Sequence, residues 1–358
     1  MGLADTRFDN RRRKLASLLA ARRVDDMLVT HLTHVRYLSG FSGSNGALLV
    51  SKDRTARIAT DGRYATQVAE EVPDIEATIT RKVATELLSS VAEGHRVGYE
   101  ADYVSASQLE ALQDACPEGV ALVPVTREIE AIRLVKDELE LERLTEAAEL
   151  ASTALRELID AGELAAGQTE RRVAANLEYR MRLLGADRPS FDTIVASGLN
   201  SAKPHHGASD RVIEQGDLVT IDFGMYRSGF NSDMTRTFAV GEPTSFLREI
   251  YEVTRVSQEA GVEAAVAGAK LVEVDKACRS VIEDAGYGEY FVHSTGHGIG
   301  LDVHEGPYAA VTGTGELEAS MTLTIEPGIY VPGKGGVRIE DTLIITSGAP
   351  RVITQFPK

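Results

Sequence analysis

Short apolar segments alternate with amphipathic ones over residues 1–125, which is the pattern of strands and helices in turn. Five segments are rich in β-branched residues and bounded by Gly, Asp or Pro, so we predict strands at DDMLVTHL, NGALLVS, TARIATD, RVGYE and VALVPV. Helical spacing over residues 15–22, 64–71 and 106–116 places helices between these strands. The alternation predicts an α/β domain with its own sheet over residues 1–125.

A highly charged segment follows, and its apolar positions have the spacing of one long helix over residues 128–160. Leu139, Leu144 and Leu150 lie in its most charged stretch, KDELELERLTEAAELASTAL. We interpret residues 126–160 as a linking helix that leads into a second domain over residues 161–358. The same helix could also form a dimer surface, and its pattern does not separate the two roles.

The second half of the chain contains a weak internal repeat. The segment IEQGDLVTIDFG (213–224) aligns without gaps on LEASMTLTIEPG (317–328), at a constant offset of 104 residues from 213 to 317 and from 222 to 326. Each copy ends its strand on a carboxylate and returns through a hairpin to a second one, which gives the pairs Asp222–Asp233 and Glu326–Glu340. Two half-domains related by an approximate twofold axis would place all four carboxylates around one centre. The alternative is a chance similarity between two apolar strands.

The composition limits the partners and the location of the protein. A net charge of −16 on 358 residues argues against binding to nucleic acids and to anionic membrane surfaces. No apolar run reaches the ~18 residues that a transmembrane helix needs, and the N-terminal residues lack the apolar core of a signal peptide. Cys116 and Cys278 are too few for a disulfide framework. We therefore expect a cytoplasmic protein with no nucleic-acid or membrane partner.

The four carboxylates indicate bound cations, because a carboxylate at the end of an apolar strand is costly to bury without a counter-charge. Five of the eight histidines lie between residues 205 and 304, and three of these occur among glycines in HSTGHGIGLDVHE. Such an oxygen-rich set suits two divalent cations better than one, since two carboxylates can bridge. The candidate ligands are Asp222, Asp233, His297, Glu326 and Glu340. A four-histidine zinc site, an HExxH helix and a GxSxG nucleophile elbow do not fit the sequence.

Several motifs resemble those of the pita-bread metallopeptidases, a family that includes methionine aminopeptidases, aminopeptidase P, prolidase and the metal-free creatinases. These motifs are SDMTRTF, GHGIGLDVHE, TIEPGIY and GVRIEDT, while VRYLSGFSGSNGALLV and ATDGRY look like the N-terminal domain of the proline-specific branch. Methionine aminopeptidases typically lack that domain and creatinases lack the full metal set, so the chain is most similar to bacterial Xaa-Pro peptidases of the prolidase or aminopeptidase P type. The resemblance implies an α+β fold, with a pseudo-twofold pita-bread (creatinase/aminopeptidase-like) catalytic domain and an N-terminal creatinase-type α/β domain with a mixed sheet.

By that resemblance, the five ligands would bind two divalent metal ions, Mn²⁺ by preference and Co²⁺ or Zn²⁺ as alternatives, with Asp233 and Glu340 bridging. Glu326 is also the candidate proton shuttle. The remaining candidate catalytic residues are His205, His293, His304 and Arg338. His206 is the alternative to His205, and Tyr330 matches a family tyrosine but could equally be a plain strand residue.

The reaction implied by the resemblance is metal-dependent hydrolysis of the N-terminal Xaa-Pro peptide bond by a homodimer. An Xaa-Pro dipeptidase is the first expectation, and an Xaa-Pro aminopeptidase that acts on longer peptides is the alternative. A metal-free binding module and a creatinase-like hydrolase are more distant alternatives. A dipeptidase must bind the free carboxylate of proline, for which Arg338 or a group of the N-terminal domain is a candidate.

Overall fold

A computed structural model describes residues 6–358, and the chain divides into two compact units between Arg133 and Leu134. The segment 128–160, predicted as one helix, is instead two helices, α6 (Glu128–Arg133) and α7 (Glu138–Asp160). The chain breaks because Asp137 caps α7, where its carboxylate accepts from the backbone N–H of Glu140 in a capping box. Within residues 6–358, no helix has the length and apolar character needed to cross a membrane.

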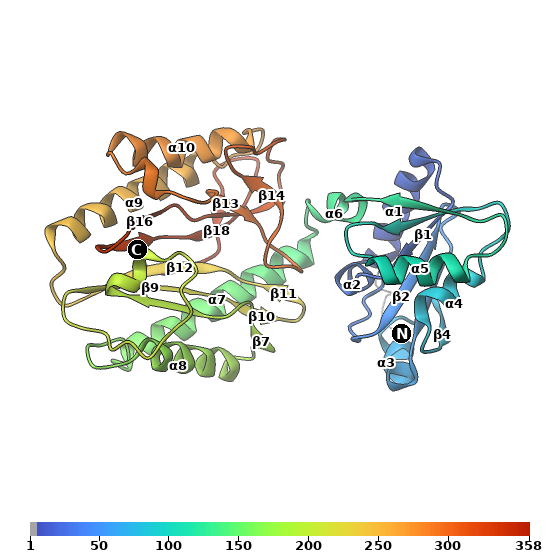
Figure 1. The fold of residues 1–358 in the computed structure, drawn as a ribbon, viewed down its shortest axis with the longest axis horizontal. Helices are drawn as coiled ribbons and strands as arrows, with labels where there is room; N and C mark the ends of the chain where they lie inside the picture. Colours follow the sequence, from blue (N-terminus) through green and yellow to red (C-terminus); the bar gives the residue numbers. More distant parts are fainter. Residues whose placement is uncertain (1–5) are drawn as a thin grey trace. The chain divides into compact units, whose positions relative to one another are not determined.

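The N-terminal unit is built on a six-stranded mixed sheet in the order β4-β3-β2-β1-β5-β6 (Figure 1). Strand β1 pairs antiparallel with β2 and parallel with β5, which confirms the predicted mixed sheet. The strands are β1 (Asp26–Val29), β2 (Gly46–Ser51), β3 (Ala56–Thr60), β4 (Glu76–Ile79), β5 (Arg96–Glu100) and β6 (Ala121–Val125). The helices are α1 (Arg7–Arg22), α2 (Leu32–Ser39), α3 (Ala65–Glu71), α4 (Val83–Ser89) and α5 (Ala106–Ala115), with the 3-10 turn η1 (Gly62–Tyr64).

Helices cover both faces of this sheet, because strand β2 is apolar on both sides. Ala47 and Leu49 pack in one core with Leu87 and Leu88 of α4 and with Leu112 of α5. The alternate residues of β2 are also buried, and helices α1 and α2 pack against this strand. Strand β4 and helices α2 and α4 are additions to the elements that the sequence predicts.

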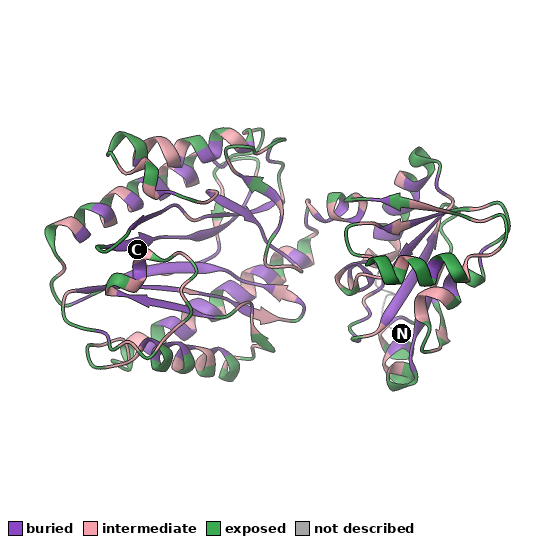
Figure 2. Ribbon diagram, in the orientation of Figure 1, coloured by how far each residue is buried: buried purple, intermediate pink, exposed green. Residues whose placement is uncertain are grey.

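The second unit consists of strands that lie between two layers of helices (Figure 1). Its helices are α7, α8 (Glu170–Leu183), α9 (Ser245–Ala264) and α10 (Leu271–Asp284), with the 3-10 turns η2 (Gly198–Ala202) and η3 (Gly288–Tyr290). Its strands are β7 (Arg188–Pro189), β8 (Ile194–Ser197), β9 (Asp217–Phe223), β10 (Met225–Arg227), β11 (Phe230–Asn231), β12 (Met234–Val240), β13 (Gly296–Gly298), β14 (Glu305–Ala309), β15 (Thr322–Ile325), β16 (Gly328–Val331), β17 (Gly335–Arg338), β18 (Asp341–Ile344) and β19 (Arg351–Val352). The strands are buried, whereas the outward faces of the helices are exposed (Figure 2).

Two apolar cores correspond to the two halves of the predicted repeat. In one, helices α7 and α8 pack against strands β8, β9 and β12. In the other, helices α9 and α10 pack against strands β15 to β18. Strand β9 therefore corresponds to β15, strand β12 to β18, and the hairpin β10–β11 to the hairpin β16–β17. This confirms the predicted pseudo-twofold arrangement of the catalytic domain.

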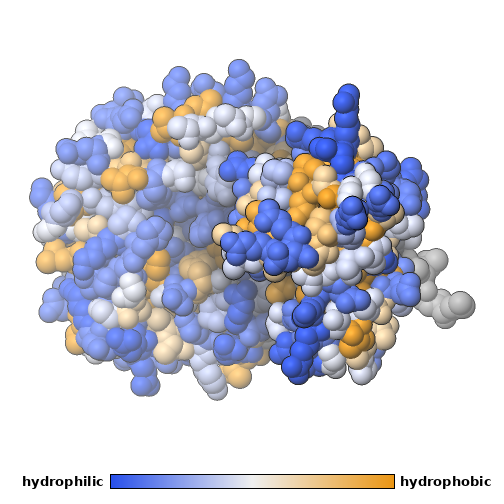
Figure 3. Space-filling view, turned by 45° about the vertical axis from the view of Figure 1, so that its right-hand side comes forward, coloured by the Kyte–Doolittle hydropathy of each residue, from blue (hydrophilic) through white to orange (hydrophobic). Residues whose placement is uncertain are grey.

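Hydrophilic residues dominate the face shown in Figure 3, where apolar residues form separate groups. Among the described residues, Tyr179, Leu183 and Leu199 are examples of apolar side chains that remain exposed. Such scattered exposure is usual for a folded protein and carries no functional argument.

Candidate metal centre and active site

Four carboxylates lie at strand ends in the second unit. Asp222 is the residue before the last in β9, and Asp233 directly precedes β12, which pairs antiparallel with β9. Glu326 directly follows β15, and Glu340 directly precedes β18, which pairs antiparallel with β15. The two predicted carboxylate pairs therefore occupy equivalent positions in the two halves of the unit.

Reciprocal hydrogen bonds join the two halves at Asp233 and Glu340. The Thr235 hydroxyl donates to Glu340 Oε2 at 2.8 Å, and the Thr342 hydroxyl donates to the Asp233 carbonyl oxygen at 2.8 Å. The backbone N–H of Glu340 also donates to the Thr235 carbonyl oxygen at 3.1 Å. Each threonine lies two residues after the carboxylate of its own half, so the same position in each repeat fixes the acid of the other repeat.

His297 faces this junction from strand β13, whose flanking glycines allow the close approach. A Cβ atom on Gly296 would lie 1.7 Å from the Thr324 carbonyl oxygen, and one on Gly298 would lie 2.0 Å from the Gly306 carbonyl oxygen. His297 Nδ1 donates to the Gly298 carbonyl oxygen at 3.0 Å, which leaves Nε2 as the atom that can bind a cation.

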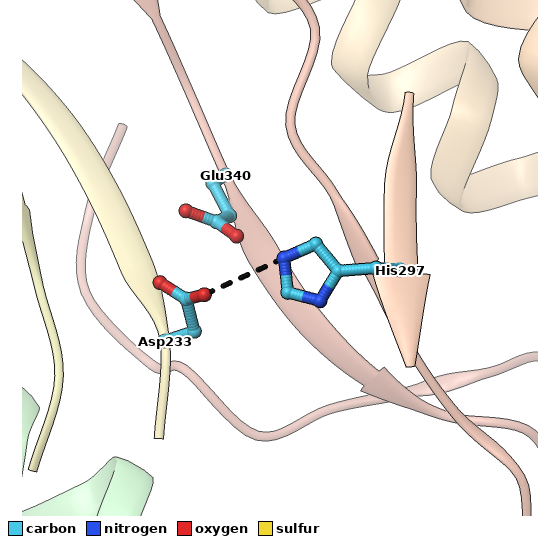
Figure 4. A group of neighbouring side chains, drawn as sticks. All are labelled: Asp233, His297 and Glu340. Atoms are coloured by element: carbon cyan, nitrogen blue, oxygen red, sulfur yellow. Dashed lines mark ion pairs between the residues drawn. The ribbon is translucent and has the colours of Figure 1, made fainter. Parts of the chain in front are cut away.

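Asp233, His297 and Glu340 point toward one another (Figure 4), and each offers one ligand atom within 4.8 Å of the others. His297 Nε2 lies 3.6 Å from Asp233 Oδ2 and 3.3 Å from Glu326 Oε1. The structure thus brings the imidazole together with three of the four carboxylates. Asp222 joins the group through electrostatics, since its charge helps to raise the pKa of the other three carboxyls.

The chemistry of these donors fits divalent cations. Burial and then the charge of neighbouring acids raise the pKa of Asp233 and Glu340 well above the ordinary values, and burial raises that of Glu326 to about 8. Burial also lowers the pKa of His297 to about 4, so its imidazole is neutral and can act as a ligand. Asp222 Oδ1, Asp233 Oδ1 and Glu340 Oε1 are buried without a hydrogen-bond partner among residues 6–358. Cations would satisfy these oxygens and reverse the electrostatic penalty.

Arg338 is buried beside the acids and donates hydrogen bonds to four protein groups. Its Nη2 donates to Asp222 Oδ2 at 2.6 Å, and its Nε donates to the Thr235 hydroxyl at 3.1 Å. Its Nη1 donates to the Tyr330 hydroxyl at 2.8 Å and to the Pro204 carbonyl oxygen at 3.1 Å. A guanidinium committed in this way compensates Asp222 and does not offer a free fork to a substrate carboxylate.

The Tyr330 hydroxyl connects Arg338 to His293 through hydrogen bonds. The Tyr330 hydroxyl accepts from Arg338 and lies 2.9 Å from His293 Nε2, while His293 Nδ1 donates to the Ser294 carbonyl oxygen at 2.8 Å. Burial lowers the pKa of His293 to about 4, so this imidazole is neutral and its Nε2 accepts a hydrogen bond from the Tyr330 hydroxyl. The structure therefore gives Tyr330 a polar role beside the site.

The other two candidate imidazoles approach from separate loops. The His304 ring lies 4.4 Å from the His297 ring, centre to centre. His205 is exposed, and its charge contributes to lowering the pKa of both His293 and His304, after the larger effect of burial. His206 instead turns to Glu170, whose Oε2 lies 2.7 Å from His206 Nε2. This contact distinguishes the two adjacent histidines, and His205 is the one whose charge affects the pKa of His293 and His304.

Sequence reasoning missed the residues that hold these groups in place. Thr235 lies in the motif SDMTRTF and Thr342 in the motif GVRIEDT. Each follows its carboxylate, Asp233 or Glu340, by two residues, and this equal spacing in the two halves of the repeat could have identified them. Glu170 carries no such signal, because its partners begin 27 residues further along the chain and share no motif with it.

Comparisons with known proteins agree with this geometry. Residues 142–347 match the model of metallopeptidase family M24, and residues 11–135 match the creatinase/prolidase N-terminal domain. The Xaa-Pro dipeptidase of Pyrococcus furiosus is 37% identical over 343 residues, which cover 96% of this chain and 97% of that protein.

Solved structures extend the similarity to three dimensions. The Xaa-Pro dipeptidase from Bacillus anthracis is 40% identical with a TM-score of 0.94, covering 98% of each chain. The X-Pro aminopeptidase from Thermotoga maritima MSB8 is 34% identical with a TM-score of 0.87, covering 97% of this chain and 98% of that one. On these similarities and on the sequence match over more than half its length, the chain belongs to metallopeptidase family M24.

Proposed function

We propose that this protein hydrolyses the peptide bond between an N-terminal residue and proline, as an Xaa-Pro dipeptidase of the prolidase type. The observation that carries the proposal is the buried group of four carboxylates and one neutral imidazole, three of whose oxygens have no partner among residues 6–358. The similarity to Xaa-Pro dipeptidases in sequence and structure supports the choice of substrate.

The charges of the cluster favour two cations over one. Four ionised carboxylates and the Arg338 guanidinium sum to −3, so one divalent cation would leave −1 and two would give +1. A positive centre stabilises negative charge that develops on a substrate carbonyl oxygen. We assign the cations to five ligands, with Mn²⁺ as the first choice and Co²⁺ or Zn²⁺ as alternatives: Asp222, Asp233, His297, Glu326 and Glu340.

When bound, such a pair supplies Lewis acidity, which polarises a carbonyl and makes water acidic enough to provide the nucleophile near neutral pH. The protein contributes the proton transfers. Glu326 reaches into the centre, where its Oε1 lies 3.3 Å from His297 Nε2 and accepts from the Thr324 hydroxyl at 3.4 Å. We assign it to accept the proton of the attacking water and to deliver it to the proline nitrogen, which has no N–H of its own before cleavage.

The imidazoles outside the ligand set would bind the substrate or hold the groups around it. His205, His293 and His304 approach the carboxylates from three different segments, and burial lowers the pKa of the last two. Neutral imidazoles can donate one hydrogen bond to a carbonyl oxygen without adding a charge to the site. We assign His205 and His304 to the developing oxyanion and to the carbonyl that follows proline. His293 would instead hold the Tyr330 hydroxyl beside the site, because its one N–H is donated to Ser294.

A second candidate function is an Xaa-Pro aminopeptidase that acts on longer peptides. The engagement of Arg338 with four protein groups favours it, because this arginine is not free to bind the carboxylate of a C-terminal proline. The similarity to the X-Pro aminopeptidase structure agrees with this alternative. The two functions differ in whether the substrate ends at proline.

One assay separates these functions and tests the proposal. Protein loaded with Mn²⁺, Co²⁺ or Zn²⁺ is given an Xaa-Pro dipeptide and the matching Xaa-Pro-Xaa tripeptide, and released N-terminal residue is measured. A dipeptidase turns over the dipeptide far faster, and an aminopeptidase prefers the tripeptide. Activity on neither peptide, together with less than one bound cation per chain by elemental analysis, would contradict both peptidase functions. The metal-free binding module and the creatinase-like hydrolase would then be the remaining hypotheses.

The homodimer, which follows from the family resemblance alone, and the cytoplasmic location, which follows from the composition, are also part of this proposal. Sedimentation equilibrium at several concentrations would measure the mass, and a monomer at micromolar concentration would exclude a stable dimer. Fractionation of the source cells would test the location.

A further inference from the structure

The segment that carries His205 runs from Ser197, the last residue of β8, to Ser209. Both of its ends return to Glu170, the first residue of helix α8. Thr169 caps that helix by accepting from the backbone N–H of Arg172, which places Glu170 in the first turn, where the helix dipole favours a negative charge. One side chain thus lies at the point where the loop begins and ends.

The Glu170 carboxylate accepts six hydrogen bonds, divided evenly between its two oxygens. Oε1 accepts from the backbone N–H and the hydroxyl of Ser197, at 2.8 and 2.7 Å, and from Asn200 Nδ2 at 3.0 Å. Oε2 accepts from His206 Nε2 at 2.7 Å and from the backbone N–H and the hydroxyl of Ser209, at 3.1 and 2.5 Å. One oxygen therefore holds the entry to the loop and the other holds its exit.

The burial of this carboxylate shows how completely the loop satisfies it. The Glu170 side chain has no exposed surface, and burial by itself opposes its ionisation. The hydrogen bonds from Ser209, Asn200, Ser197 and His206 outweigh that effect and lower its pKa to about 2. The charge is thus stabilised by the loop itself, through serine, asparagine and histidine donors.

On its other side, the loop is attached to the acidic cluster. The carbonyl oxygen of Pro204, the residue before His205, accepts from Arg338 Nη1 at 3.1 Å. The Ser201 hydroxyl accepts from the backbone N–H of Gly336 at 2.8 Å. The same arginine binds Asp222, so the position of His205 relative to the carboxylates depends on both attachments. The two adjacent imidazoles have different surroundings: His206 is bonded to Glu170, whereas His205 is exposed and its charge affects His293 and His304.

We propose that Glu170 is a positioning residue for His205: its carboxylate clamps both ends of the loop, retains His206 and thereby presents His205 to the substrate. This inference rests on the proposed Xaa-Pro hydrolysis for its kinetic consequences, but the clamp itself is independent of the reaction. Both Glu170 oxygens are occupied by the loop, so the residue acts through the loop and not as a ligand or a catalytic group.

The test uses Glu170→Gln, which keeps the shape of the side chain but replaces one acceptor oxygen by an NH₂ group. That group cannot accept the three donors at its end of the loop. Glu163→Gln is the matched control, because Glu163 accepts from Asn176 and Arg180 of the same helix and contacts no residue of the loop in its hydrogen bonds. Both variants are compared with wild type, with His205→Ala and with the double variant E170Q/H205A, all as the full chain loaded with Mn²⁺.

We expect E170Q to lower kcat/KM for the Xaa-Pro substrate roughly 10- to 100-fold, since a misplacement of about 1 Å costs up to about 100-fold. In the H205A background, the same change should cost no more than about threefold, because the two residues act as one unit. The amount of Mn²⁺ bound by E170Q should match that of wild type. The kcat/KM of the E163Q control should also match wild type. A loss from E170Q that is equally large with and without His205 would overturn the proposal, as would unchanged kcat/KM.

Hydrogen exchange tests the clamp without any substrate. In E170Q, the backbone amides of Ser197 or Ser209 should exchange at least about tenfold faster, while the amides of β9 and β12 keep their wild-type rates. Unchanged exchange at both serines would refute the clamp even in a protein that hydrolyses no Xaa-Pro bond. Faster exchange in E170Q, together with a wild-type protein that hydrolyses no Xaa-Pro bond, would instead retain the clamp and refute the proposed reaction.

Discussion

Replacing Glu326 by Gln removes one ionisable group from the buried acidic cluster, and we expect the metal-free protein to become more stable by an amount that grows with pH. In the unfolded chain this carboxyl ionises near its ordinary pKa of 4.5, but burial raises its pKa in the folded protein to about 8. Because the folded-state value is the higher, the folded protein binds more protons, and Glu326 lowers the free energy of unfolding as pH rises from 4.5 to about 8.

The magnitude follows from the separation of the two values. Each pH unit between them is worth about 1.4 kcal/mol, so ionised Glu326 destabilises the metal-free protein by roughly 5 kcal/mol at pH 9 and by about 1 kcal/mol at pH 5. For a domain of 150–250 residues, 1 kcal/mol corresponds to about 2–4 °C in Tm. The variant should therefore unfold roughly 10–20 °C above wild type at pH 9 and only about 2–4 °C above it at pH 5.

Scanning calorimetry of both proteins after removal of cations by chelation, at several values between pH 5 and 9, measures this difference directly. Groups that titrate alike in the two proteins cancel from the comparison. Added Mn²⁺ should stabilise wild type more than the variant, because a glutamine amide is a weaker ligand than a carboxylate. A Tm difference that stays constant with pH, or a metal-free wild type that is the more stable protein at pH 9, would refute the electrostatic account of the cluster.

Four other substitutions test three separate parts of the site. Asp233→Ala or Glu340→Ala should reduce bound cation below two per chain and lower kcat at least about 100-fold, by elemental analysis and kinetics; wild-type turnover with two bound cations would contradict the ligand assignment. His304→Ala should keep the cations and lower kcat about 100-fold, and loss of metal or full activity would exclude a role in substrate binding. Arg338→Met should destabilise the cation-free protein by about 3–5 kcal/mol in chemical denaturation at pH 8, since it leaves Asp222 buried without its partner; an unchanged unfolding midpoint would show that this pair is not needed.

Much of the fold follows from patterns that are local in the sequence. All five predicted strands of the first unit are present, because their β-branched residues and flanking turns specify extended structure without help from distant contacts. The strand predicted at DDMLVTHL is shorter than expected, since Leu32 already begins helix α2. The one predicted helix over residues 128–160 was wrong for a related reason, because the capping carboxylate of Asp137 overrides the continuous helical spacing.

Helix α9 shows why apolar periodicity does not predict every helix. Its buried face begins with Leu247 and Ile250 but continues with Thr254, Gln258 and Gly261. These residues are buried because the neighbouring strands offer them hydrogen bonds or close contact, as where Gln258 Nε2 donates to Asp341 Oδ2 at 3.0 Å. The apolar stripe is therefore interrupted in the sequence, although the face is continuous in the structure.

The candidate site divides in the same way. Each ligand carboxylate could be located from the end of an apolar strand, where its burial demands compensation. The attachments that place the substrate-side groups could not, because Glu170 and Arg338 each collect partners from several segments of the chain. Such contacts depend on the tertiary arrangement and leave no periodic trace in the sequence.

The two repeats differ at one position where the site needs different chemistry. Two residues before each junction carboxylate lies a buried side chain, Asn231 before Asp233 and Arg338 before Glu340. The Asn231 amide donates to the carbonyl oxygens of Gly300 and Leu301, at 3.1 and 2.9 Å, and so holds the segment between His297 and His304. Arg338 occupies the equivalent position and instead holds Asp222 and the His205 loop. A second arginine in place of Asn231 would bring the cluster charge from −3 to −2 and weaken its demand for cations, so the pairing of one neutral and one charged anchor keeps the acids unsatisfied until metal binds.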